Sequence, residues 1–337
     1  MSTKQPTSLV KFTDAETAIR ILDDAKLRWS APCLLNDPFE LNHRSSLNFD
    51  SKGLLVACVK ATLGLIFSRD EPSGNSPLIK AIRRWRAEDR FESEDEATEV
   101  LKELLASMVE HRDPELLEIM RDWKRYASRL RILSLSDSHE NLALWDSYGD
   151  RHTGIAIRFG CGENSSLENP IAMSYSDTRP EISTLDEQID IIMAQQKTHF
   201  QDYFPDKFLN KSKLQSKEKE WRLLATVDTV QQDESLWFDD IGFASTEIRA
   251  VYLGAGMENT KKQEVVTILQ RKYPKARQFQ AVVKNSQFEL NFERLNPQDK
   301  SMRKPNLSRR LFKQRTPLQN SSSKQLFNQI QLDAESN

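Results

Sequence analysis

The amino-acid sequence predicts one α+β body with a mixed or antiparallel central sheet, a mainly helical insertion and a disordered basic C-terminal tail. Strand-like and helix-like segments mix without regular βαβ alternation, which favours α+β over a doubly wound sheet. Hydrophobic residues make up 38% of the 337 residues, and six Trp and sixteen Phe supply the bulk for a core. We therefore expect an α+β domain over residues 1–295, with the insertion at about 45–129, and the tail over residues 296–337.

The first predicted element is a helix that starts near Thr13. Thr13 and Glu16 have the spacing of a capping box, and an apolar stripe follows at helical spacing. A short strand is expected over residues 26–30. After it, Asn36 and Asp37 stand before a proline, and this pattern is typical of a turn.

The insertion is expected to consist of helices. Ser93 and Glu96 have capping-box spacing before an apolar helical pattern, and a separate helix is expected from Pro114 to Ala127, with the proline near its first position. The basic and aromatic residues 83–86 are interpreted as a solvated helix face in preference to a nucleic-acid contact.

Beyond residue 129 the sequence becomes strand-rich. Apolar, β-branched segments bounded by turn residues predict strands over 130–135, 153–159, 171–175, 221–227 and 248–253, and a hairpin from 278–283 and 288–292. Helices are expected over 185–197 and 260–272.

Several protein classes are disfavoured by composition. No stretch approaches the roughly 20 apolar residues of a membrane span, and the first residues lack the apolar segment of a secretory signal. The three cysteines, Cys33, Cys58 and Cys161, have no paired spacing, so neither a disulfide framework nor a metal site is expected. A cytoplasmic location without membrane contact fits these observations.

Charge divides the chain into two parts. Seven basic residues and no acidic one lie between Lys300 and Arg315, so the tail has the opposite sign to the acidic body. Electrostatic contact of the tail with nucleic acid is one interpretation, and a solvated tail without a specific partner is the favoured one. The oligomeric state is not indicated.

Four blocks of the sequence resemble the bacterial family known as domain of unknown function 2971. They are residues 8–40 ending in Asn-Asp-Pro-Phe-Glu, residues 132–159 with Leu-Trp-Asp-Ser-Tyr, residues 211–222 with Glu-Lys-Glu-Trp-Arg, and residues 248–254. The resemblance implies no biochemical activity, and some members of the family look like components of defence-associated loci. Ser147 stands where the family usually has His, which puts any role of that His in doubt here.

Glu218 and Glu220 are the candidate catalytic residues. If both lie on a strand, their carboxylates project from the same face, and their repulsion should raise the pKa of one. Arg222 would share that face and hold one carboxylate ionised. The alternative is a charged, solvated strand edge.

The Glu-x-Glu pattern also resembles the catalytic strand of ADP-ribosyltransferases, enzymes that use NAD as substrate. That resemblance implies that Glu220 stabilises an oxocarbenium-like transition state and that Glu218 orients the acceptor. Ser134 and Ser136 match the Ser-x-Ser strand of the same pattern, and Arg28 is the candidate for its early basic residue, which would hold the pyrophosphate.

Three further residues are candidate ligand contacts: Asp37 in the turn, Tyr148 as a stacking ring, and His152 as a general base. For Asp37 a self-capping turn is an equal alternative, and for His152 a structural role is favoured. Phe39 and Trp145 are expected in the core. We expect the candidate residues, with Lys11, to converge on one cleft.

Two functions follow from the sequence. One is an ADP-ribosyltransferase-like or NAD-cleaving enzyme. The alternative is a non-catalytic module that senses a nucleotide-like small molecule or binds a protein.

Overall fold

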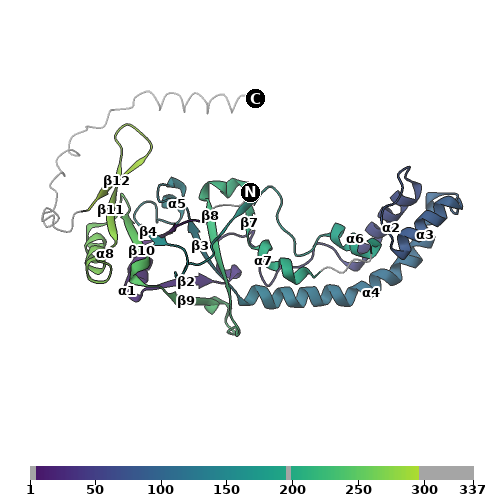
Figure 1. Ribbon diagram of the computed structural model, residues 1–337, viewed down its shortest axis with the longest axis horizontal. Helices are drawn as coiled ribbons and strands as arrows, with labels where there is room; N and C mark the ends of the chain where they lie inside the picture. Colours follow the sequence, from purple (N-terminus) through teal and green to yellow (C-terminus); the bar gives the residue numbers. More distant parts are fainter. Residues whose placement is uncertain (1–4, 195–198, 296–337) are drawn as a thin grey trace, which may run out of the picture. The chain divides into compact units, whose positions relative to one another are not determined.

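A computed structural model describes residues 5–194 and 199–295 of the chain. It contains a ten-stranded sheet with some helices beside it, while a larger group of helices extends away from the sheet to one side (Figure 1), and the expected α+β class is confirmed. The strand order is β12-β11-β10-β4-β1-β3-β2-β9, with β8 on β3 and β5 on β8. The sheet is mixed, since β10 and β11 pair in parallel while the other pairs in this sheet are antiparallel.

Most strands expected from the sequence are present with shifts of a few residues, but the single strand expected over 171–175 is divided into two short strands that belong to different sheets. The strands of the large sheet are β1 (Ser8–Thr13), β2 (Lys26–Ser30), β3 (Leu130–Ser136), β4 (Ile155–Gly160), β5 (Ile171–Ala172), β8 (Glu220–Thr226), β9 (Phe238–Gly242), β10 (Ile248–Leu253), β11 (Arg277–Val283) and β12 (Leu290–Arg294). A separate pair is formed by β6 (Ser174–Ser176) and β7 (Asn210–Ser212).

The expectation that the chain begins with a helix was wrong. Strand β1 comes first and lies in the middle of the sheet between β4 and β3. Leu9, Val10, Phe12 and Thr13 are all buried, so burial along this strand does not alternate between a buried and an exposed face. The next helix, α1 (Ala15–Asp24), is capped by Asp14, whose carboxylate accepts from the backbone of Thr17, in place of the expected Thr13.

One face of the sheet is covered by α1 and α8 (Asn259–Lys272), which pack on each other. Ala18 and Leu22 of α1 and Val265 and Leu269 of α8 are fully buried against strand residues such as Ile157. On the other face the short helix α5 (Leu142–Ser147) buries Trp145 in a smaller cluster with Val10 and Phe12. The two faces thus have separate cores, because successive strand residues point to opposite sides.

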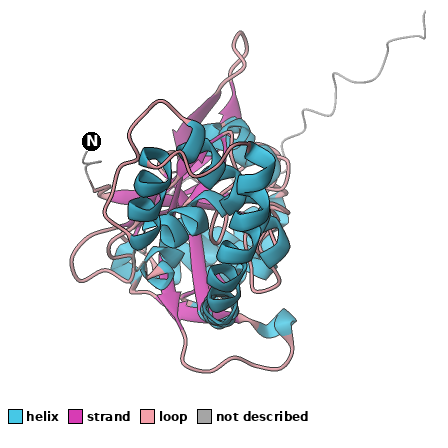
Figure 2. Ribbon diagram, turned by 90° about the vertical axis from the view of Figure 1, so that its right-hand side faces the viewer, coloured by secondary structure: helices cyan, strands magenta, loops and turns pink. Residues whose placement is uncertain are grey.

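The insertion is helical, as expected. It contains α2 (Ser51–Phe67), α3 (Pro77–Ala87) and α4 (Glu94–Arg129), and α6 (Leu185–Ala194) packs against α2 and α3. The helices form one group in front of the strands in the view of Figure 2. Ser93 caps α4 by accepting from the Glu96 amide, whereas the Glu96 carboxylate accepts from Glu92, so only half of the expected capping box forms.

The separate helix expected from Pro114 does not exist, because α4, which is 36 residues long, contains this proline in its interior. Packing explains the continuity: Leu101, Leu105 and Val109 before the proline and Leu116 and Ile119 after it belong to one buried cluster. The apolar contacts of both halves outweigh the lost hydrogen bond.

Pro114→Ala is therefore expected to stabilise the chain, by up to about 3 kcal/mol, because it restores a helical hydrogen bond and removes a steric clash. Urea unfolding followed by circular dichroism measures the change. An unchanged or lowered unfolding midpoint would show that α4 accommodates the proline without cost.

The sheet opens between β1 and β2, and this opening positions the candidate site. Both strands pair with the same edge of β3 but at opposite ends, through Val10 with Ser136 and through Ser30 with Ile132. Among the described residues, the middle of β3, around Ser134, therefore has no strand partner on that edge. Its other edge is fully paired with β8.

Among the described residues, no helix is long and apolar enough to cross a membrane. The predicted basic tail over 296–337 and the end of the helix expected to reach residue 197 lie outside the described residues.

Candidate functional site

A cavity of about 520 Å³ lies at the opening between β1 and β2, a volume within the usual range for small-molecule sites. Strands β1, β2, β3 and β8 contribute to it, together with the segment after β2 and the end of α5. Its charged and polar lining consists of Lys11, Thr13, Asp14, Thr17, Arg28, Ser30, Asn36, Asp37, Glu40, Ser134, Ser136, Ser147, Tyr148, Asp150, Lys211, Glu218, Glu220 and Arg222.

Glu220 is at the centre of a buried ion-pair network in this cavity. Its Oε1 accepts from Arg222 Nε at 2.7 Å, and its Oε2 accepts from Lys211 Nζ at 3.0 Å. Lys211 Nζ also donates to Glu218 Oε2 at 2.7 Å, and the guanidinium of Arg222 makes a two-pronged contact with Glu40. Arg222 is 1% exposed, and both of its carboxylate partners, Glu220 and Glu40, are also buried.

The network keeps Glu220 and Lys211 charged. Burial alone would raise the pKa of Glu220, but the positive charges of Arg222 and Lys211 outweigh burial and hold the pKa below its usual value. Burial would likewise lower the pKa of Lys211, but the charge of Glu220 and the contact with Glu218 raise it above its usual value. The cavity therefore contains an anionic carboxylate fixed by two cations.

Two expectations about the Glu pair were wrong. Glu218 ends the 3₁₀ helix η3 (Lys213–Glu218), Lys219 has a left-handed backbone with φ 46°, and only Glu220 belongs to β8. The two carboxylates meet because both contact Lys211, and not through strand alternation. The expected rise does not occur at Glu220, because the charges of Arg222 and Lys211 outweigh burial and lower its pKa. Arg222, two residues along β8, does share the face of Glu220.

Ser134 and Ser136 lie directly opposite Arg222 and Glu220 in the β3–β8 register. The Ser136 hydroxyl donates to the carbonyl of Glu218 at 2.9 Å, which fixes the turn into β8. The Ser134 carbonyl, on the open edge of β3, accepts from Lys11 Nζ at 3.1 Å. Burial lowers the pKa of Lys11, with the charge of Glu220 opposing this effect.

Arg28 lines the cavity from β2 and is half-exposed. Its guanidinium pairs with Asp240 on the neighbouring strand β9 at 3.0 Å and lies 3.7 Å from the ring centroid of Phe238. Both Nε and Nη2 of Arg28 donate to Asp240, and 53% of the Arg28 side chain remains exposed.

The segment after β2 contributes Asp37 and Glu40. Asp37 Oδ1 accepts from the Phe39 amide at 2.9 Å, the self-capping turn that was one of the two expectations for this residue. Phe39 was expected in the core but is 66% exposed, because this turn points its ring outward. Glu40 and Lys211 were not chosen as site residues, although both stand within the family-like blocks.

Tyr148 lines the cavity beyond α5 and is exposed, whereas Trp145 is buried, as expected. His152 is not among the residues that line the cavity. Its ring stacks on Trp145 with centroids 6.4 Å apart, and its backbone has φ 66° in the turn before β4. The other candidate residues and Lys11 therefore line one cavity, as predicted, whereas His152 does not.

The network predicts a pH dependence of stability. The pKa of Glu220 is lowered on folding, so its ion pairs stabilise the fold above the unfolded value of about 4.3 and are lost as pH falls through the folded value. Lys211 contributes below about pH 10.4, and its contribution is lost as pH rises through its raised pKa. When the pH is lowered from 7 to 3, the urea concentration at the unfolding midpoint should decrease, and it should decrease less in Glu220→Gln than in wild type. An equal decrease in both proteins would show that the Glu220 ion pairs do not contribute to this pH dependence.

Comparison with known proteins gives one match. The model of a family described as "Protein of unknown function (DUF2971)" matches residues 144–223, which extend from α5 into β8 and include Lys211, Glu218, Glu220 and Arg222. The match supports the resemblance to this family over part of the second block and all of the third, and assigns no activity. No curated protein and no solved structure gives a significant match.

Proposed function

We propose that the chain is an ADP-ribosyltransferase-like or NAD-cleaving enzyme whose substrate occupies the cavity between β1 and β2. The observation that carries the proposal is the position of Arg28, the Ser134–Ser136 pair and Glu220. They come from three strands, β2, β3 and β8, and all line one cavity. The resemblance to ADP-ribosyltransferases requires these residue types in this order and on one site.

The charge state of Glu220 supports its role. Cleavage of a glycosidic bond passes through an oxocarbenium-like transition state with positive charge on the sugar ring. A fixed carboxylate beside that ring stabilises the developing charge without reorganisation. Glu220 is ionised, 6% exposed and fixed by Arg222 and Lys211. Each carboxylate oxygen retains acceptor capacity for a ribose hydroxyl, since an ionised carboxylate offers about four lone-pair sites.

The leaving group distinguishes NAD from ordinary sugars. Hydrolysis of an O-glycoside uses a carboxylic acid with a raised pKa to protonate the departing oxygen. The pKa of Glu220 is shifted in the opposite direction. The nicotinamide of NAD is cationic in the substrate and leaves as a neutral molecule, so its departure requires no proton donor. An anionic Glu220 therefore suits this substrate class.

The other residues have roles that follow from their positions. Glu218, whose side chain is 19% exposed against 6% for Glu220, orients the acceptor at the cavity entrance. Ser134 supports the ribose or Glu220, and half-exposed Arg28 holds the pyrophosphate by charge-assisted hydrogen bonds. Tyr148, exposed at the rim, stacks on the nicotinamide ring.

A second candidate is a non-catalytic module that binds a nucleotide-like ligand or a protein. The observation that favours it is the pairing of Glu220, since Arg222 and Lys211 already contact both carboxylate oxygens. An ion-pair network that holds two strands together has this arrangement without any chemistry.

Incubation of the full chain with NAD labelled in the adenylate part, with and without cell lysate, tests the proposal. We expect release of nicotinamide, with label on protein if an acceptor is present. Saturable NAD binding without release favours the second candidate, and absence of both binding and release overturns the NAD proposal.

A further inference from the structure

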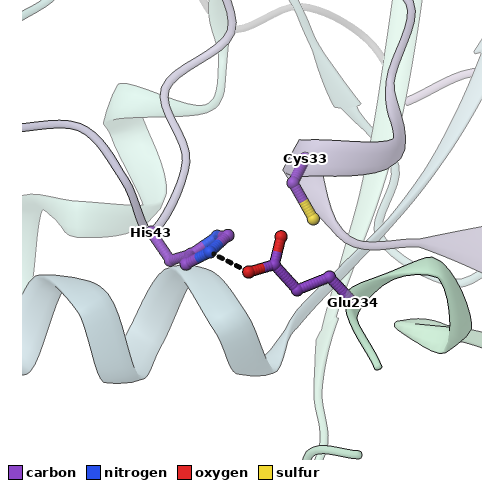
Figure 3. A group of neighbouring side chains, drawn as sticks. All are labelled: Cys33, His43 and Glu234. Carbon is purple, nitrogen blue, oxygen red and sulfur yellow. Dashed lines mark hydrogen bonds and ion pairs between the residues drawn. The ribbon is translucent and has the colours of Figure 1, made fainter. Parts of the chain in front are cut away.

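Cys33, His43 and Glu234 form a second cluster of chemically reactive side chains, outside the cavity lining. Their nearest ligand-type atoms all lie within 4.8 Å of one another. Figure 3 shows the thiol of Cys33 and the ring of His43 on two sides of the Glu234 carboxylate. Spacing along the chain did not indicate this group, because three separate segments supply it.

The fold brings the three segments together in a defined way. Cys33 lies on the 3₁₀ turn η1 (Pro32–Leu34) just after β2, and Glu234 begins the turn η4 (Glu234–Leu236) just before β9. Strands β2 and β9 pair through Ser30 and Phe238, so the two turns are adjacent. The carbonyl of Asn42, next to His43, accepts from the buried indole of Trp123 on α4, which holds the third segment in place.

The donor atoms are preorganised. His43 Nε2 lies 3.1 Å from Glu234 Oε1, and the His43 ring packs edge-on against Trp237 at 4.7 Å between centroids. Arg44 contacts the other carboxylate oxygen, Oε2, and this arginine side chain is 72% exposed. The exposed Arg44 thus balances the charge at Oε2 of Glu234, while Oε1 is directed toward the His43 imidazole.

We propose that Cys33, His43 and Glu234 bind one divalent transition-metal ion, with Zn²⁺ the best match. Thiolate, imidazole and carboxylate are all zinc ligands, and bonds of about 2.0–2.3 Å in a tetrahedron place donor atoms about 3.3–3.8 Å apart. The cluster, with donors within 4.8 Å, reaches that spacing by small side-chain movements. The fourth position is left to water, and the thiolate disfavours Mg²⁺ and Ca²⁺.

The ion would connect the two sites of the molecule. Leu34 and Leu35 beside Cys33, and Asp37 and Glu40 before His43, line the cavity between β1 and β2. Metal binding at both ends of residues 33–43 fixes this segment and thereby one wall of the cavity. The inference does not depend on NAD being the substrate.

Titration of the chelator-treated full chain with Co²⁺, which reports thiolate ligation by a charge-transfer band, tests the site. We expect one equivalent to bind, Zn²⁺ to displace it, and Mg²⁺ to leave it in place. Cys33→Ser should abolish the band, and His43→Ala should weaken binding by more than the 10–100-fold typical of losing an outer-shell partner. Cys161→Ser and His111→Ala, which change residues outside the cluster, should bind as wild type.

Circular dichroism and melting of each metal-free variant establish that it folds. Absence of a cobalt–thiolate band in the folded wild type, or its persistence in Cys33→Ser, would overturn the proposal and leave an ordinary His–Glu hydrogen bond beside a thiol. If Cys33→Ser does not fold, Glu234→Gln decides by the same titration: weakened binding supports the site, and unchanged affinity overturns it.

Discussion

Arg222→Ala is expected to destabilise the chain by about 3–5 kcal/mol, the range measured when one partner of a buried ion pair is removed. The guanidinium contacts Glu220 and Glu40 and donates to the carbonyl of Phe208 at 2.7 Å. Its removal leaves the buried carboxylates of Glu220 and Glu40 without their shared partner, while Lys211 still contacts Glu220. Urea unfolding at pH 7, followed by tryptophan fluorescence, measures the loss.

Arg84→Ala is the matched control, because Arg84 pairs with Glu88 on an exposed helix face and its removal should leave the unfolding midpoint unchanged. A second variant, Glu40→Gln with Arg222→Ala, should recover part of the lost stability, since it removes one uncompensated charge. If Arg222→Ala were no more destabilising than Arg84→Ala, the network would not hold the site together as described.

Glu220→Gln is expected to lower the rate of nicotinamide release by about 10²–10³-fold, the effect of removing one preorganised electrostatic group from a transition state. The replacement retains the shape of the side chain but removes the charge that stabilises the oxocarbenium-like ring. Single-turnover measurements at saturating NAD isolate this step from binding. Melting of the variant must be followed in parallel, because Lys211 and Arg222 lose their common partner.

Glu218→Gln distinguishes the proposed role of Glu218 from that of Glu220. If Glu218 orients the acceptor, this variant should retain nicotinamide release within a few-fold of wild type and lose transfer of label to protein. Glu99→Gln, at an exposed position of α4, is the control for both variants and should retain both activities. Equal loss of release in Glu218→Gln and Glu220→Gln would contradict the division of roles.

The sequence was most informative where function depends on neighbours along a strand. The Ser134–Ser136 and Glu220–Arg222 pairs each share a strand face, as alternation requires, and their strands form along the expected segments. The fold class followed from the same local patterns. Glu218 was placed on the strand in error, because a left-handed Lys219 leaves no signal in composition.

Pairing between distant segments could not be read from the sequence. Glu40 contacts Arg222 across 182 positions, and His43 contacts Glu234 across 191, and no periodicity encodes either contact. The opening of the sheet has the same origin, because it depends on β1 and β2 sharing one edge of β3. Strand β1 was not predicted, because both of its faces are covered. Lys11 was therefore a candidate site residue although the strand that carries it had not been predicted.

A structure of the full chain with a non-cleavable NAD analogue, in which carbon replaces the ring oxygen of the nicotinamide ribose, tests the central claim most directly. The account predicts that the nicotinamide ribose lies in the cavity between β1 and β2, with a hydroxyl within hydrogen-bond distance of Glu220 and the pyrophosphate next to Arg28. Binding of the analogue elsewhere, or a cavity filled by the ion-pair network alone at saturating analogue, would contradict it.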